Sequence, residues 1–136
     1  MAEITLQAKV ENIRQVVAFV EEKLEAMGCA MKAQMQLSIA VDELFTNIAC
    51  YAYAPGSGMA TVRVEAISGG QQARITFIDQ GVPYNPLKKE DPDITLSAEE
   101  RPIGGLGVFM VKKTMDEMDY RFENGNNILT IVKTIA

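Results

Sequence analysis

Two oxygen-bearing side chains stand one helical turn apart within an apolar stretch of the chain. Glu43 and Asn47 lie in the run from Leu37 to Ile48, whose apolar spacing is that of a helix. With Leu37 set at 0° and about 100° per residue, they fall at roughly 240° and 280°, away from the solvent-facing positions. Side chains at i and i+4 reach one small target, and carboxylate and amide oxygens suit Mg²⁺. The pair predicts a metal or proton-transfer site, and it also fits the polar edge of a solvated face.

An acid and a glycine stand at the end of a strand-like run. Asp79 closes the run from Ala73, and Gly81 follows two residues later. An acid at a strand end can accept a hydrogen bond from a nucleotide base, and a glycine leaves room for a flat group to approach. Asp and Gly are also good turn formers, so a plain turn is the alternative for this segment.

A glycine-rich segment opens the next helix-like run. Gly104, Gly105, Leu106 and Gly107 precede the apolar residues 108–111. Backbone N–H groups and the helix dipole both favour anions at a helix N-terminus, so the segment predicts a phosphate cradle, with a flexible hinge as the alternative. It is neither a Walker A loop nor a Rossmann fingerprint, because the Gly-Lys-Ser/Thr ending and the position after a first strand are both missing. Together the three segments meet the separate needs of a bound ATP.

The elements that must position these residues follow from periodicity and turn signals. A long proline-rich loop, residues 82–103, separates the second hairpin strand from the last helix. Hairpins dominate the strand connections, so we expect one domain over residues 1–136: an α/β two-layer sandwich with helices on one face of a mixed, largely antiparallel sheet. The expected strands are 4–8, 61–67, 73–79, 120–123 and 128–132, and the expected helices are 10–27, 32–53 and 106–118.

Composition narrows the function classes. Thirteen basic against 18 acidic residues give a net charge of −5 without a Lys/Arg cluster, which disfavours nucleic-acid binding. The absence of histidine disfavours structural zinc and histidine acid/base chemistry. No apolar run reaches about 20 residues and the start does not resemble a secretory signal, so we expect a cytoplasmic protein without membrane contact. The methionines at 27, 31, 35, 59, 110, 115 and 118 are expected to be flexible core filler, with adaptable contact to a partner as the alternative for exposed ones.

The order Glu43-x-x-x-Asn47, Asp79-x-Gly81 and Gly105-x-Gly107 resembles the N, G1 and G2 boxes of the GHKL ATPase and kinase superfamily. The match covers nearly the whole chain. The stretch 79–86 and the direct entry into Gly104 are most similar to the stand-alone anti-sigma-factor serine/threonine kinases. Many relatives place a histidine after the Asn box, where this chain has Tyr51 and Tyr53, so no role of that histidine carries over.

The resemblance implies ATP and Mg²⁺ as cofactors and a role for each matching residue. It implies that Glu43 is the general base and Asn47 a Mg²⁺ ligand, that Asp79 accepts a hydrogen bond from adenine, and that Gly81 opens the base pocket. The loop 82–103 would be an ATP lid. The remaining residues implied to contact the nucleotide are Gly105, Leu106 and Gly107 at the phosphates and Thr130, through a water, near adenine.

The expected function is that of an ATP-dependent protein serine/threonine kinase of the partner-switching type. By resemblance, it would sequester a sigma factor, phosphorylate an anti-anti-sigma protein and form a homodimer. The alternative is a non-catalytic, nucleotide-gated binding module, which does not require Glu43.

Overall fold

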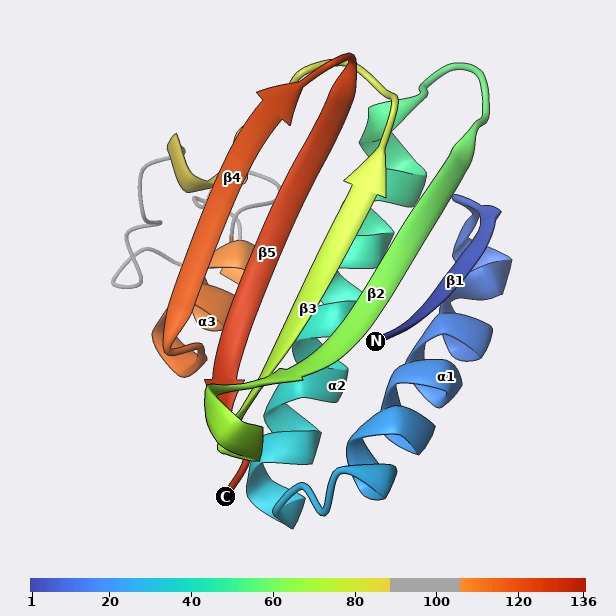
Figure 1. The fold of residues 1–136 in the computed structure, drawn as a ribbon. Coiled ribbons are helices and arrows are strands. Elements are labelled where there is room, and N and C mark those ends of the chain that lie inside the picture. Colours follow the sequence, from blue (N-terminus) through green and yellow to red (C-terminus); the bar gives the residue numbers. More distant parts are fainter. Residues whose placement is uncertain (89–105) are drawn as a thin grey trace.

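A five-stranded sheet forms one layer of the computed structural model, which describes residues 1–88 and 106–136. The strand order is β1-β2-β3-β5-β4, and every neighbouring pair is antiparallel (Figure 1). The expected two-layer α/β architecture is confirmed, and within the described residues the sheet is antiparallel throughout. The strands are β1 (Ala2–Gln7), β2 (Met59–Ile67), β3 (Gln72–Asp79), β4 (Glu117–Glu123) and β5 (Asn126–Thr134).

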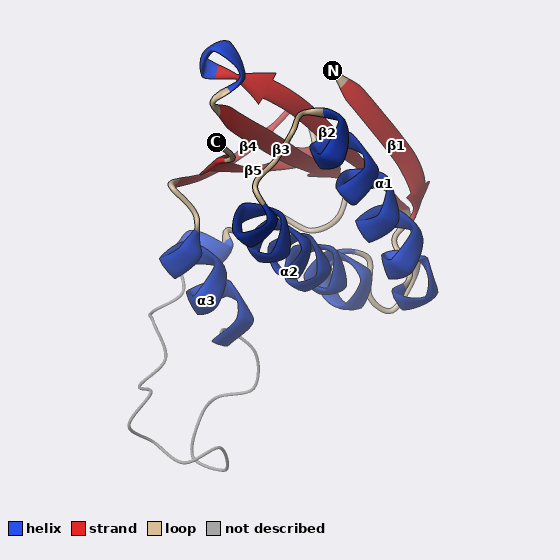
Figure 2. Ribbon diagram, turned by 90° about the horizontal axis from the view of Figure 1, so that it is seen from below, coloured by secondary structure: helices blue, strands red, loops and turns tan. Residues whose placement is uncertain are grey.

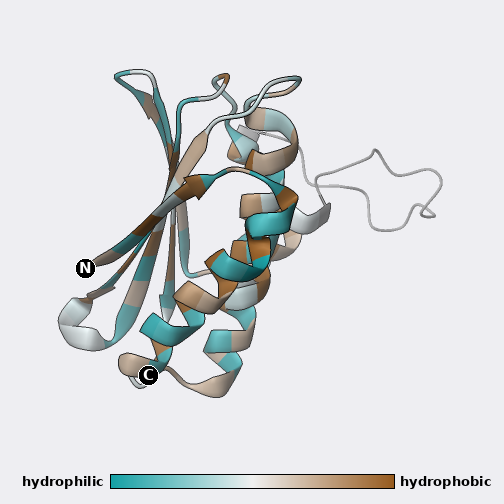
Figure 3. Cartoon of the chain, turned by 90° about the vertical axis from the view of Figure 1, so that its right-hand side faces the viewer, coloured by the Kyte–Doolittle hydropathy of each residue, from teal (hydrophilic) through white to brown (hydrophobic). Residues whose placement is uncertain are grey.

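In the part of the chain that the structure describes, three α-helices pack against one face of this sheet, with α2 between the other two (Figure 2). Seen from the side, helices and sheet form two distinct layers (Figure 3). Within residues 1–88 and 106–136, no helix is both long and apolar enough to span a bilayer. The helices are α1 (Ile13–Ala26), α2 (Met31–Asn47) and α3 (Leu106–Thr114), with the short helices η1 (Val10–Asn12), η2 (Ile48–Ala52), η3 (Ser68–Gly70) and η4 (Pro86–Lys88).

The core lies between the two layers and follows from the sequence periodicity. Alternate residues of β2 and β3 are buried, as expected for strands with one covered face. The helices contribute apolar residues at a spacing of three and four. Fully buried side chains include Val16, Val20 and Leu24 of α1, Leu37, Val41 and Phe45 of α2, and Val62, Ile75, Phe77 and Ile131 of the sheet.

Two helix boundaries differ from the expectation. The second helix does not continue as an α-helix to Tyr53; it ends at Asn47 and widens into the π-helix η2. The third helix stops at Thr114 instead of Met118, because the Lys133 ammonium donates to the Thr114 carbonyl (2.6 Å) and β4 begins at Glu117. The π-helix matters for the site, since such wide turns occur often at functional positions.

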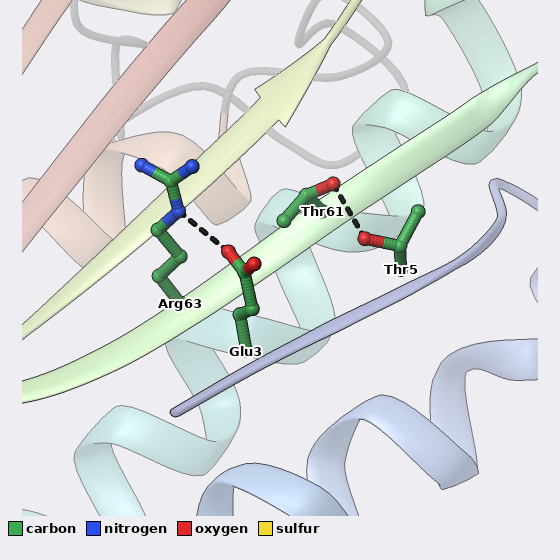
Figure 4. Close-up of polar contacts among 4 residues, drawn as sticks. All are labelled: Glu3, Thr5, Thr61 and Arg63. Atoms are coloured by element: carbon green, nitrogen blue, oxygen red, sulfur yellow. Dashed lines mark hydrogen bonds and ion pairs between the residues drawn. The ribbon is translucent and has the colours of Figure 1, made fainter. Parts of the chain in front are cut away.

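Polar contacts on the face away from the helices hold the edge strand β1 to β2. The Thr5 and Thr61 hydroxyls lie 2.8 Å apart, and Arg63 Nε donates to Glu3 Oε2 at 2.7 Å (Figure 4). Glu3 faces Arg63 and Thr5 faces Thr61 in the strand register, so each contact is a direct cross-strand pair.

Candidate active site

A cavity of about 140 Å³ opens where β3 ends, beside the last turns of α2 and η2. Its walls are mostly apolar, with aromatic rings at several positions and a few polar groups. Such a cavity is the usual form of a small-molecule site. The apolar lining includes Leu44, Ile48, Phe77, Val82 and Leu129, the aromatic lining Tyr51, Tyr84 and Tyr120, and the polar lining Asn47, Asp79 and Asn127.

Asp79 is a buried acid in the wall of this cavity, with only 5% of its surface exposed. Its Oδ1 accepts hydrogen bonds from the Gly81 N–H and from Asn127 Nδ2, each at 2.9 Å. Within the described residues, no donor contacts the second oxygen, Oδ2. Asp79 can therefore accept a hydrogen bond from a ligand without losing one from the protein.

Asn127, which the sequence analysis did not identify as a site residue, is the second buried polar residue of the cavity. Only 6% of its surface is exposed. Besides Asp79, its Nδ2 donates to the carbonyls of Val82 (3.0 Å) and Gly81 (3.3 Å). Its Oδ1 accepts from the Tyr84 N–H at 3.2 Å and lies close to the Tyr120 hydroxyl. Asn127 thus ties the end of β3 and the segment after it to β5.

The role expected of Gly81 needs correction. A Cβ at Gly81 would lie 2.2 Å from the Ala52 carbonyl oxygen, so the protein backbone of η2 fills the space that the glycine leaves. The neighbouring Val82 N–H donates to the same carbonyl at 2.9 Å. Ala52 and Val82 line the cavity, whereas Gly81 does not. Gly81 therefore shapes the pocket by allowing two chain segments to approach closely, rather than by opening a space for the base.

The expected position of Thr130 in the site is wrong. Thr130 pairs with Thr76 and lies on the sheet face that carries Arg63 and Asp119, away from the cavity. Side chains alternate between the two faces of a strand, so the odd-numbered neighbours Asn127 and Leu129 point to the cavity instead. Asn127 stands directly opposite Asp79 in the register of β3 and β5.

Glu43 of α2 and Gly107 of α3 lie against each other. A Cβ at Gly107 would come within 2.1 Å of Glu43 Oε2, so only a glycine allows this carboxylate its place. Glu43 and Asn47 are both half-buried, and Asn47 lines the cavity one turn further along α2. The Asn47 amide thus lies at the cavity, and the Glu43 carboxylate lies one turn away, at the N-terminal end of α3, which begins at Leu106. The expected contact of Gly105 and the lid expected from residue 89 onward lie outside the described residues.

Tyr53 follows the cavity-lining residue Ala52 and connects three segments of the chain. Its hydroxyl accepts from the Gln80 N–H at 2.7 Å and donates to the Met59 carbonyl at 2.5 Å. Burial raises the pKa of the Tyr53 hydroxyl, and the negative charge of Asp79 raises it further. Tyr53 therefore remains neutral, and its hydroxyl joins the segment after η2 to the start of β2 as a donor and to the residue after β3 as an acceptor.

A buried acid in an apolar cavity, followed by an amide and by a carboxylate near a helix N-terminus, can serve a ligand with a base at one end and phosphates at the other. The family model "Histidine kinase-like ATPase domain" matches residues 6–133. The chain belongs to this family, which confirms the resemblance inferred from the three sequence boxes.

Curated relatives share most of their length with this chain. The serine-protein kinase RsbW of Bacillus mycoides is 29% identical over 133 residues, which cover 93% of this chain and 81% of that protein. The serine/threonine-protein kinase BtrW of Bordetella bronchiseptica is 24% identical over 105 residues, 77% of this chain and 73% of that protein. The kinase class that the sequence suggested is therefore the class in which these relatives are named.

A solved structure shares the fold. The crystal structure of the RsbU and RsbW domains of Rv1364c from Mycobacterium tuberculosis aligns with a TM-score of 0.66 at 18% identity. The alignment covers 98% of this chain and 31% of that one, so this chain corresponds to about a third of that longer protein.

Proposed function

We propose that this chain is an ATP-dependent protein serine/threonine kinase in which Glu43 is the general base. The observation that carries the proposal is the meeting of Glu43 with Gly107 at the start of α3, next to the cavity that contains Asp79. Phosphates bind well at a helix N-terminus, so a nucleotide whose base fills the cavity would bring its phosphates toward Glu43. The names of the curated relatives support the same reaction.

Each group of the site has a separate role in the proposed phosphate transfer. Asp79 Oδ2 accepts a hydrogen bond from the adenine amino group, and the N–H groups of Leu106 and Gly107 face the phosphates. Glu43 takes the proton of the partner's hydroxyl while that oxygen bonds to the γ-phosphorus. The bond between the γ-phosphorus and the ADP oxygen breaks, and ADP leaves. Catalysis of this kind depends mainly on positioning and electrostatics.

Asn47 fits the role of a Mg²⁺ ligand. The described residues contain no cluster of three Cys, Asp or Glu side chains that could hold a metal alone. Mg²⁺ commonly keeps several waters and takes other ligands from nucleotide phosphates, so one amide oxygen at the cavity suits it. When bound, Mg²⁺ would neutralise phosphate charge, and Asn47 would fix its place relative to Glu43.

The proposed partners follow from the resemblance to partner-switching kinases. The chain would sequester a sigma factor, phosphorylate an anti-anti-sigma protein in the cytoplasm, and act as a homodimer. Support comes from the order of the three boxes and from the kinase relatives that align with 93% and 77% of this chain.

The proposal is tested with Glu43→Gln in a transfer assay that uses labelled ATP and candidate anti-anti-sigma proteins from the same genome. Loss of a positioned general base lowers the rate by about 10²- to 10⁴-fold, whereas ATP affinity should stay unchanged. Asp42→Asn, an exposed neighbour on the same helix, is the matched control and should retain wild-type transfer.

Two results would contradict the proposal. An active Glu43→Gln protein would place the base elsewhere. Wild-type protein that binds ATP but transfers no phosphate to any candidate would favour the alternative, a nucleotide-gated binding module without catalysis.

A further inference from the structure

We propose that the outward face of α2 is the docking surface for the protein that receives the phosphate. The surface, called here the α2 ridge, consists of Met31, Met35 and Ile39 of α2 together with Met110 of α3. The proposal rests on the proposed kinase function and names the place where the acceptor protein binds.

The ridge is apolar where a surface helix normally carries polar residues. Met31, Met35 and Ile39 follow one another at a spacing of four, so they form a single stripe. Met35 is 59% exposed and Ile39 is 57% exposed, and Met110 on the neighbouring helix is 50% exposed. The buried residues of α2, such as Leu37 and Val41, already supply its contact with the core. The stripe therefore has no role in holding the domain together.

The ridge leads directly to the proposed catalytic centre. Ile39 lies one helical turn before Glu43, and Met110 lies one turn after Gly107, the residue that contacts the Glu43 carboxylate. α2 and α3 pack side by side (Figure 2), so Ile39 and Met110, the ridge residues nearest to Glu43 and Gly107 in the sequence, lie on neighbouring helices.

Among the described residues, other elements occupy the remaining directions of approach to Glu43. On the far flank of α2, α1 is joined by hydrogen bonds from Ser38 to Glu21 (3.1 Å) and from Gln34 to Glu25 (3.4 Å). The sheet covers the underside of α2, and the proposed nucleotide would fill the cavity beyond Asn47. α3 covers the other flank, so within residues 1–88 and 106–136 the outward side, where the ridge lies, is the remaining direction from which an acceptor hydroxyl can reach Glu43.

The chemistry of the ridge indicates the chemistry of its partner. An apolar stripe that ends at a carboxylate fits a protein surface that presents a serine or threonine beside apolar side chains. The hydroxyl should lie within about 6 Å of the side chain that covers Ile39, since four helical residues span that length. Methionine side chains adapt to different shapes, so the ridge can accommodate the acceptor without a matching rigid pocket.

The test is the double variant Met35→Glu/Ile39→Glu, assayed for transfer to the acceptor that the wild-type protein phosphorylates. Glutamate is a good helix former and both positions are exposed, so the fold should persist, which circular dichroism can check. We expect the KM for the acceptor protein to rise about tenfold or more, because interface anchors often contribute that much. The kcat at saturation and the affinity for ATP should stay within about twofold of the wild type.

Two further variants distinguish the loss of an apolar docking surface from a general effect of added charge. Val10→Glu alters an apolar side chain of equal exposure (56%) on η1, outside the ridge, and should leave the KM unchanged. Met35→Gln/Ile39→Gln removes the apolar contact without adding charge and should raise the KM in the same direction as the glutamates.

The outcomes distinguish this inference from the proposed function. Phosphate transfer with an unchanged KM in the double variant would overturn the docking surface and leave the kinase intact. Sedimentation showing that the double variant breaks a wild-type dimer would assign the ridge to a second copy of the chain and overturn the proposal. Absence of any transfer by wild-type protein would overturn both proposals.

Discussion

At the scale of single residues, the proposed preference for adenine depends on the orientation of the Asp79 carboxylate. Gly81 and Asn127 both donate to Oδ1 of Asp79, and within the described residues Oδ2 has no protein donor. A ligand amino group therefore meets an acceptor whose direction is already fixed. Burial of Asp79 strengthens the preference, since an unmatched polar group in such a place is costly.

This geometry makes Asp79→Asn a sharp test of base recognition. The two donors to Oδ1 require an oxygen there, so the new amide must turn its NH₂ toward the ligand, where a donor would face the adenine amino group. ATP binding should weaken by about 1.5 to 3 kcal/mol, while GTP, whose base presents an oxygen at that place, should lose less. Calorimetry with both nucleotides measures the change in preference.

The control for this variant is Asp119→Asn on β4, which lies on the opposite sheet face. It should bind both nucleotides as the wild type does. Equal affinity of the wild-type protein for ATP and GTP would contradict the adenine assignment.

Residue types alone were enough to find the acids of the candidate site but not the amide beside them. Glu43 and Asp79 stand out because each interrupts or ends an apolar run. Asn127 gives no such signal, since its importance depends on standing opposite Asp79 in a pairing between β3 and β5 that no local pattern reveals. The strand also reads Ile128, Leu129, Thr130, Ile131, apolar on both faces, so alternation could not show that Thr130 points away from the cavity.

At the scale of elements, Gly81 and Gly107 each allow two segments of the chain to approach closely. Substitution by alanine should affect stability differently at the two positions. At Gly81 an added Cβ meets backbone, the Ala52 carbonyl of η2, whereas at Gly107 it meets the end of the flexible Glu43 side chain. Backbone cannot move aside without disturbing the cavity, but a carboxylate can rotate away.

We therefore expect Gly81→Ala to destabilise the fold by about 1 to 3 kcal/mol, the usual cost of overpacking. Gly107→Ala should change stability little but reduce phosphate transfer, because it displaces the Glu43 carboxylate. Urea unfolding and the transfer assay measure the two effects, with the exposed Ser57→Ala as a neutral control. Equal stability losses for both glycine variants would show that the contact at Gly107 is as rigid as that at Gly81.

Periodicity predicted the second helix, but it predicted only part of which helix residues are exposed. The angular positions at about 100° per residue that separate Glu43 from the core also place Met31 and Met35 on the solvent side. Both side chains are exposed in the structure, which contradicts their expected role as core filler. Met115 is buried as expected. The widening of the helix into η2 gave no signal in the sequence, and its Ala52 carbonyl accepts from the Val82 N–H, a residue far along the chain.

At the scale of the whole molecule, ionised carboxylates should make the fold sensitive to acid. The Thr134 hydroxyl, which donates to Asp116, holds the pKa of that carboxyl below its ordinary value, and Arg74 does the same for Glu65. The folded protein then binds fewer protons than the unfolded chain, so these groups stabilise the fold at neutral pH and lose that effect as the pH falls through their folded values.

Unfolding by urea should therefore require less denaturant as the pH drops below about 4, the ordinary range of carboxyl groups. Asp116→Asn should be less stable at neutral pH and should lose less stability on acidification than the wild type. Asp119→Asn provides the comparison on the adjoining strand. An identical pH profile for the Asp116 variant and the wild type would remove Asp116 from this explanation.

The helix α2, Met31–Asn47, extends from the ridge past Glu43 to the cavity. A straight helix rises about 1.5 Å per residue, so the ridge residue Met35 stands about 12 Å from Glu43 along its axis. The helix thus fixes the distance between the proposed docking surface and the proposed catalytic base. A partner whose hydroxyl is offset by one turn, about 5.4 Å, would dock equally well and still miss the base. Selection among acceptors would then depend on spacing as much as on sequence.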